Sequence, residues 1–423
     1  MSICLNPDDF TAIAQPGTLS SFFRGSLEEA CNQDRMLKFL DLPEEIIGRV
    51  FSHLITPPLP WGHSAFRQTL VACTIGRLRL VCRAWADWLY EHHLYRVLSF
   101  ENASRALAFI DLLGRRSNML PRAKCQYLEV DYLWTDEDPP QISQLTQNEM
   151  IGSVILESLL GIFSDTIITL DLKFVDFFTL PSQTIQAIGR LKNLQNLRLD
   201  ISQWPSGDSA FMEAHPACFD SLLTAARGLK SLQLALPVSL PRQPDLTAAA
   251  GIPAITHLKV DVDCVDPAAL LDIAIALKPS LKSLSLGNCG EIDVKLLLPV
   301  FETLNQTLQG LFVTTTSYLT PILSLGFPNL RVLAIHGAFD SNFLRLNWTM
   351  FCQLSIEAFA ITYVKMKNSP EYFTLDMFSP LLKEWIFMKT PPGYSPPPIY
   401  LNACEARHVK CISVGHEEVS LIM

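Results

Sequence analysis

Residues 281–286 read LKSLSL, in which leucines alternate with small or polar residues. Alternation of this kind predicts a short strand with one buried face and one open face. Most copies of the pattern begin about 22–27 residues apart, and two longer steps indicate insertions. With conservative replacements, the copies are CQYLEV from 125, IITLDL from 167, LQNLRL from 194, LKSLQL from 229, ITHLKV from 255, LKSLSL from 281, LQGLFV from 308, LRVLAI from 330, IEAFAI from 356, LKEWIF from 382 and VKCISV from 409.

Apolar stretches with helical character lie between these strands, as in residues 217–229 and 267–278. A single strand and helix cannot bury their apolar sides alone, so neighbouring units must stack. The pattern and its period resemble leucine-rich repeats. The resemblance implies an α/β solenoid over residues 123–423, with parallel strands on the concave face and helices on the convex face.

The open positions of the predicted strands change character along the chain. In the first half most are polar: Tyr127, Glu129, Asp131, Thr169, Asp171, Lys173, Asn196, Arg198, Asp200, His257, Lys259 and Asp261. In the second half they become apolar or small, although solvent-facing positions favour polar residues. We therefore expect a target-binding surface at Phe312, Thr314, Val332, His336, Thr362, Ile386 and Met388. The alternative is that a loop or the C-terminal tail, GHEEVSLIM from residue 415, covers these side chains.

Residues 40–54, LDLPEEIIGRVFSHL, predict a separate amphipathic helix. Asp41 and Glu44 can form a capping box, and Pro43 falls in the first turn, where its missing N–H costs nothing. The apolar residues form two adjacent ridges, Leu42, Ile46, Val50 and Leu54 beside Ile47 and Phe51. Either the helix is buried on a broad face, or one ridge packs inside a small domain and the other meets a partner.

Four short motifs follow one another in this region: L-P-x-E-I at 42–46, V-F-x-x-L at 50–54, L-V-C-R-x-W at 80–85 and L-Y-R at 94–96. Together they resemble the F-box, over about residues 37–100. The resemblance implies a three-helix unit that docks on the small adaptor subunit of SCF-type ubiquitin ligases and, through it, on cullin. The matching hydrophobic positions, some in the core and others at the adaptor, are Leu42, Pro43, Ile46, Val50, Leu80, Val81, Cys82 and Trp85. The stretch 55–66, which contains three prolines, is longer than the usual loop between the first two helices of an F-box.

The predicted organisation is therefore an N-terminal segment (1–36), an F-box (37–100), a helical linker (101–122) and the repeat solenoid (123–423). By resemblance, the chain is the substrate receptor of an SCF ubiquitin ligase, with an unknown protein target and no bond chemistry of its own. One rival is a scaffold that binds the adaptor or another partner without ligase assembly. A weaker rival is an enzyme, but no phosphate-binding, dinucleotide, metalloprotease or serine-hydrolase motif occurs.

Composition limits the partners and the compartment. The net charge of -9 disfavours nucleic acid, and the apolar runs are too short to cross a membrane. The N-terminus lacks the basic start of a secretory signal, so we expect a soluble protein of the cytoplasm or nucleus whose 11 cysteines stay reduced.

Two groups of metal-ligating residue types were weighed. Cys404, His408, Cys411 and His416 resemble a zinc knuckle only loosely, so we expect no metal and no cofactor. His92 and His93 end a predicted helix, where a cation suits the helix dipole.

Overall fold

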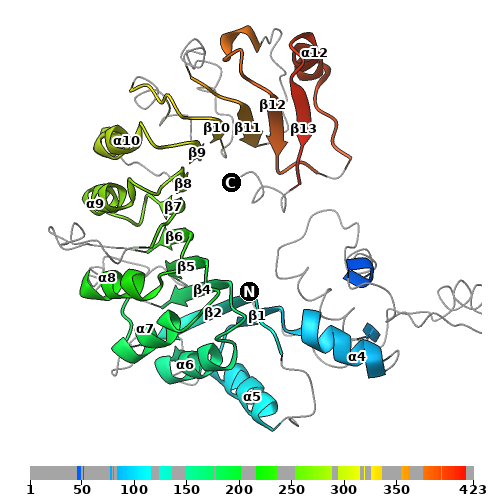
Figure 1. Cartoon of the computed structure of the whole chain (residues 1–423), viewed down its shortest axis with the longest axis vertical. Helices are drawn as coiled ribbons and strands as arrows, with labels where there is room; N and C mark the ends of the chain where they lie inside the picture. Colours follow the sequence, from blue (N-terminus) through cyan, green and yellow to red (C-terminus); the bar gives the residue numbers. More distant parts are fainter. Residues whose placement is uncertain are drawn as a thin grey trace, which may run out of the picture. The chain divides into compact units, whose positions relative to one another are not determined.

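The computed structural model describes residues 45–48, 51, 77–78, 80, 83–115, 123–135, 149–175, 178–201, 216–236, 253–287, 294–314, 319, 325–335, 354–362, 375–391 and 393–415 (Figure 1). The chain divides into two compact units. Unit 1 comprises Met1–Leu59 and His63–Ala86, and unit 2 comprises Pro60–Gly62 and Asp87–Met423. In unit 1, residues 45–48 and 51 are helical, as the sequence predicts.

Unit 2 is built on one parallel sheet of 13 strands, which confirms the α/β class. Its strands are β1 (Val97–Phe100), β2 (Tyr127–Trp134), β3 (Ile151–Gly152), β4 (Thr169–Phe174), β5 (Asn196–Ile201), β6 (Ser231–Ala235), β7 (His257–Asp261), β8 (Ser283–Gly287), β9 (Gly310–Val313), β10 (Val332–Ile335), β11 (Ala358–Thr362), β12 (Glu384–Met388) and β13 (Lys410–Ser413). Apart from β3, which pairs with β2, the strands follow one another in chain order. This order is that of a solenoid-like stack, in which each unit pairs only with its neighbours.

Helices connect the strands on one side of the sheet (Figure 1). The helical elements of unit 2 and of its junction with unit 1 are α4 (Arg83–Leu89), η3 (Tyr90–Leu94), α5 (Ala103–Gly114), α6 (Ser153–Ile162), α7 (Ser182–Gly189), α8 (Pro216–Ala225), α9 (Pro267–Leu277), η5 (Val294–Leu297), α10 (Leu298–Leu304), η9 (Leu375–Met377) and α12 (Pro398–Ala406). Helix α6 packs on α7, α7 on α8, and α9 on α10. Within the described part of the chain, no helix is both long and apolar enough to cross a membrane.

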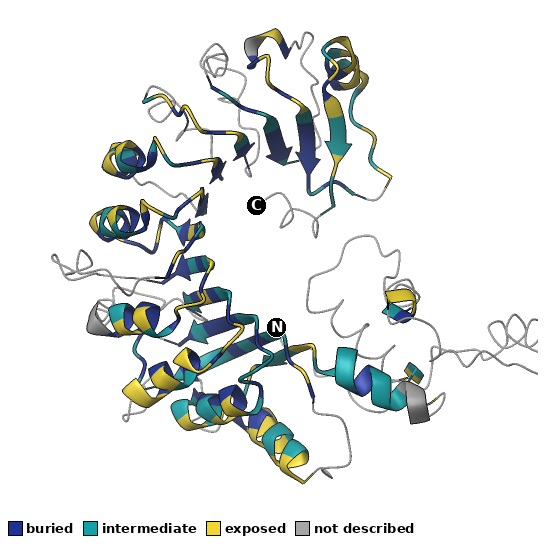
Figure 2. Ribbon diagram, in the orientation of Figure 1, coloured by how far each residue is buried: buried dark blue, intermediate teal, exposed yellow. Residues whose placement is uncertain are grey.

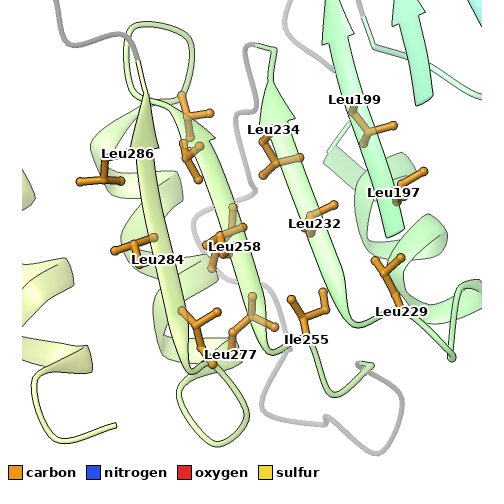
Figure 3. Close-up of a cluster of buried hydrophobic side chains, with 14 of the residues drawn as sticks. Leu197, Leu199, Leu229, Leu232, Leu234, Ile255, Leu258, Leu277, Leu284 and Leu286 are labelled. Carbon is orange, nitrogen blue, oxygen red and sulfur yellow. The ribbon is translucent and has the colours of Figure 1, made fainter. Parts of the chain in front are cut away.

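The main core lies between the sheet and these helices. Leu197, Leu232, Leu258 and Leu284 occupy one register across β5 to β8, and each is at most 2% exposed (Figure 3). Burying a leucine side chain contributes about 1.5–3 kcal/mol, so this repeated position stabilises the stack strongly. Figure 2 shows the corresponding pattern, with buried strands and helices exposed on their outer sides.

The sheet begins earlier in the chain than the repeat pattern indicates. Strand β1 pairs with β2 in parallel, although its residues fall in the range 37–100 that the sequence assigned to the small helical domain. The predicted helical linker, 101–122, contains α5, which packs on β1, β3 and α6. Asn102 caps α5 by accepting a 2.9 Å hydrogen bond from the backbone N–H of Arg105. Residues 97–115 are thus part of the stack of unit 2.

Candidate functional site

The sheet face opposite the helices carries polar side chains in its first half. The strand register aligns them in rows, for example Glu129 beside Asp171 and Asp171 beside Arg198. We call the following open-face side chains the polar face: Tyr127, Glu129, Asp131, Asp171, Lys173, Asn196, Arg198, Asp200, Gln233, His257, Lys259 and Asp261. Most of them are half-buried or exposed, so a partner can reach them.

Hydrogen bonds and ion pairs between β2, β4 and β5 fix part of the polar face. Asp171 is only 6% exposed, and it accepts a 2.7 Å hydrogen bond from the hydroxyl of Tyr127. The guanidinium of Arg198 lies 3.7 Å from Asp171 Oδ2 and 5.8 Å from the centre of the Tyr127 ring. Burial nevertheless raises the pKa of Asp171.

A second set of ion pairs joins strands β2 and β4. Lys173 Nζ lies 2.5 Å from Glu129 Oε1 and 3.7 Å from Asp131 Oδ2. These two carboxylates and Asp171 raise the pKa of Lys173 against the opposing effect of burial, which is the largest single contribution. The ammonium of Lys173 is therefore held in its charged form between strands β2 and β4.

Lys259 in β7 lies in a different environment. Among the described residues, no carboxylate lies within ion-pair distance of its ammonium, although the side chain reaches solvent. Partial burial and the charge of Arg198 lower its pKa, against the opposing effect of Asp261 and Asp200. Lys389, which follows β12, also has a lowered pKa, from burial and from the charge of Lys259. The polar face therefore contains cations that repel one another.

The second half of the open face is apolar, as predicted, but it is not an accessible surface. Phe312, Ala334, Ala360, Ile386 and Met388 form a buried cluster, separate from the core on the helix side. The expectation of an open target-binding surface is therefore wrong for Phe312, Ile386 and Met388, which are at most 4% exposed. Among the described residues, Val332, Ala358, Ile412 and Val414 pack against this cluster.

The remaining residues expected to bind a target are less buried or not described. Val332 is half-buried and packs against the apolar cluster, and Thr314 and Thr362 are half-buried. His336 lies outside the described residues, as does the tail from residue 416 that the sequence offered as a cover.

The residues expected to bind the adaptor belong to unit 1. Ile46 is 42% exposed and Leu80 is 79% exposed, whereas the neighbouring Ile47 and Phe51 are buried. Trp85 lies in α4, and its side chain is outside the description. Leu42, Pro43, Val50, Val81 and Cys82 also lie outside the described residues.

The histidines and cysteines considered in the sequence take separate positions. Burial, together with the charges of Arg96 and His92, lowers the pKa of His93 to about 4, so a cationic role for His93 at the helix end is wrong at neutral pH. Cys404 in α12 and Cys411 in β13 interact through their side chains, and the Cys404 thiol lowers the pKa of Cys411. In the described residues no group of three or more histidine, cysteine or acidic side chains is arranged to hold a metal. His416 lies outside the description.

Sequence reasoning did not select the polar face as a site. All side chains of the polar face except Gln233 are among the open positions named from the sequence, but the sequence favours the apolar half as the binding surface. The signal that could have identified them is the mixture of both charge signs at equivalent positions of successive strands, such as Asp171 and Arg198.

Neither models of known protein families nor curated proteins give a significant match to this chain.

Proposed function

We propose that the chain is the substrate-recognition subunit of an SCF-type ubiquitin ligase, with an F-box in unit 1 and leucine-rich repeats in unit 2. The F-box docks on the adaptor and, through it, on cullin, and the repeats bind a protein target. The chain supplies no reacting group. Its contribution is proximity, because a target held beside a charged ubiquitin-conjugating enzyme reacts as if it were highly concentrated.

The observation that carries the proposal is the split between the two ridges of the first helix. Ile47 and Phe51 are buried, but Ile46 is 42% exposed. Leu80, from the motif at residues 80–85, is 79% exposed. Exposed aliphatic side chains at matching F-box positions favour the alternative in which one ridge forms a core and the other meets a partner.

The repetitive sheet supports the recognition half of the proposal. Parallel strands stacked in chain order present an extended face, and such faces bind proteins in other repeat architectures. With Phe312, Ile386 and Met388 buried, the polar face between β2 and β7 is the more accessible part of this face among the described residues. We therefore assign target binding to the polar face in place of the apolar positions.

The proposal is tested by affinity purification of the tagged full chain, followed by mass spectrometry of its partners. The variant is Ile46→Ala/Leu80→Ala, which truncates two exposed side chains and preserves the buried Ile47 and Phe51. The matched control is Val154→Ala, because Val154 is 73% exposed on α6 of the other unit. Leu42→Ala/Pro43→Ala serves as a second F-box variant.

The expected result is that wild type and Val154→Ala retain adaptor and cullin, whereas both F-box variants lose them. Proteins that the F-box variants still retain are then candidate targets, and their ubiquitylation by the purified complex is measured directly. Retention of adaptor without cullin would favour a scaffold over a ligase receptor. Absence of both from wild type would overturn the proposal.

A further inference from the structure

The open face of β5, β6 and β7 carries two rows of opposite charge. Arg198, Gln233 and Lys259 occupy one register across the three strands. Two residues further along their strands stand Asp200 and Asp261. The rows are separated by about 6.6 Å, because each residue of a strand advances about 3.3 Å. Cations and carboxylates therefore face solvent in parallel lines.

The positive charges of Arg198 and Lys259 in the cationic row are only partly balanced by carboxylates of the described residues. Arg198 is oriented by Asp171 and by the Tyr127 ring, yet 45% of its side chain is exposed. Lys259 is exposed and has no ion pair among the described residues. Strands lie about 4.8 Å apart, so the backbones of Arg198 and Lys259 are separated by about 10 Å, with the amide of Gln233 between them. A carboxylate fits this interval.

The acidic row carries the opposite charge, with a carboxylate at Asp200 in β5 and another at Asp261 in β7. Asp200 Oδ1 accepts a 2.7 Å hydrogen bond from the N–H of Ile201. Burial and the carboxylates of Asp171 and Asp261 raise the pKa of Asp200, against the opposing effects of the Ile201 N–H and of the Lys173 charge. Between the two acidic strands the register partner of Asp200 is the uncharged Ala235, so no charge of the chain stands between Asp200 and Asp261 in this row. A lysine or arginine side chain placed over this row is attracted by both carboxylates.

We propose that these two rows bind an extended protein segment in which an acidic and a basic side chain stand two residues apart. An extended chain places such side chains about 6.6 Å apart on one face, which equals the spacing of the rows. The five residues that form this site, termed the dipolar patch, are Arg198, Asp200, Gln233, Lys259 and Asp261.

The acidic row decides between possible anionic ligands. A doubly charged phosphate over Arg198 and Lys259 would lie close to Asp200 and Asp261, and like charges at such distances repel. A single carboxylate accompanied by a cation is attracted by both rows. Nucleic acid, with its continuous line of phosphates, is disfavoured for the same reason.

Naming the bound segment as part of a ligase target depends on the proposed function. The binding itself does not, and it is measured without any ligase subunit. Loss of cullin association with retained peptide binding would remove the ligase role and leave the dipolar patch as a protein-binding site. The reverse result would remove the patch and leave the ligase role.

The experiment selects short random peptides displayed on phage against the purified full chain. Enriched peptides are synthesised, and their affinity is measured by fluorescence anisotropy. The expected consensus contains an acidic and a basic residue separated by one residue. Lys259→Gln is expected to weaken binding about tenfold, and so is Asp261→Asn, whereas the exposed-lysine control Lys282→Gln leaves it unchanged.

Peptide variants combined with protein variants show which row contacts which residue of the peptide. Once the acidic residue of the peptide is replaced by its amide, Lys259→Gln should have little further effect, because the two changes remove the same contact. The same holds for the basic residue of the peptide and Asp261→Asn. The inference is overturned if no peptide is enriched, if the consensus lacks the charge pair, or if Lys259→Gln and Lys282→Gln bind equally well.

Discussion

The hydroxyl of Tyr127 in β2 donates a 2.7 Å hydrogen bond to Asp171 Oδ2 in β4, and this contact joins residues 44 positions apart. Asp171 is 6% exposed, so loss of the donor leaves a buried carboxylate with fewer partners. Tyr127→Phe should lower the free energy of unfolding by about 1–3 kcal/mol.

The measurement is a double-mutant cycle in guanidinium chloride with Tyr127→Phe, Asp171→Asn and the combined variant. If the hydrogen bond is responsible, the combined loss is smaller than the sum of the single losses. Additive losses would contradict the assignment, because they would show that the Tyr127 hydroxyl and the Asp171 carboxylate contribute independently of each other.

Glycines at the junctions between helices provide a second test, because added methyl groups meet different amounts of space. A Cβ on Gly189 would lie 3.2 Å from Ala225 Cβ, and one on Gly228 would lie 3.0 Å from the backbone oxygen of Leu194. Gly161 in α6 has nothing within 4 Å of the added Cβ. Gly161→Ala should therefore stabilise by about 0.5–1 kcal/mol through helix propensity.

Gly228→Ala should instead destabilise by about 1–3 kcal/mol, because the clash is with backbone that cannot rotate away. Gly189→Ala should fall between the other two, since part of its contact is a side chain. Chemical denaturation of the three variants ranks them, and a Gly228→Ala chain as stable as wild type would show that the stack can separate at this junction at little cost.

The fold was largely predictable because the repeat places apolar residues at fixed intervals. Every copy of the pattern became a strand, from β2 to β13 with the exception of β3. Strand β1 has the same alternation at Leu98 and Phe100, but Tyr95 stands at the leading position, where the copies of the pattern have an aliphatic residue or cysteine, so the pattern does not extend to it. Strand β3 has two residues, too few for any period to be visible.

The candidate site was less predictable, because alternation tells which face a side chain takes but not what covers that face. Phe312 and Ile386 stand at open positions, as expected, yet they are buried. Contacts such as Lys173 with Glu129 depend on which strands are neighbours and on their register. Strand neighbours and register cannot be read from one sequence before the sheet is known. The F-box assignment of Ile46 and Leu80 remains a prediction.

His93 in η3 should make the stability of unit 2 depend on pH. Burial and the charge of Arg96 lower the pKa of His93 from 6.5 to about 4. Between these two values the unfolded chain binds a proton that the folded chain refuses, so stability falls as pH drops through this range. His93→Gln should reduce the difference between the guanidinium midpoints at pH 7 and pH 5.

The matched control is His257→Gln, since His257 is exposed in β7. This substitution removes a histidine and leaves the surroundings of His93 unchanged, so the pH difference that His93 causes should remain. Any general loss of packing around Trp88, whose ring centre lies 4.7 Å from that of His93, lowers both midpoints equally and does not affect the comparison. An unchanged difference in His93→Gln would mean that His93 binds its proton over the same pH range in the folded and in the unfolded chain.

Asp220 in α8 should be a source of instability that substitution removes. Its Oδ1 is buried without a hydrogen-bond partner in the described structure, and burial raises its pKa. An unsatisfied buried polar atom costs about 1–3 kcal/mol, so Asp220→Ala should raise the free energy of unfolding at pH 7 by about 1 kcal/mol. Asp272→Ala in α9 is the control, because it reports the gain in helix propensity alone.

The gain from Asp220→Ala should also depend on pH. Above the folded-state pKa the carboxylate is charged and its burial cost is complete. As pH falls, the folded chain takes up a proton before the unfolded chain does, and below the ordinary value of 3.8 both are neutral and the charge-related cost has gone. Denaturation at pH 7 and at acidic pH should show the advantage over Asp272→Ala shrinking. An advantage that is equal at both pH values would mean that side-chain shape, and not charge, limits stability at this position.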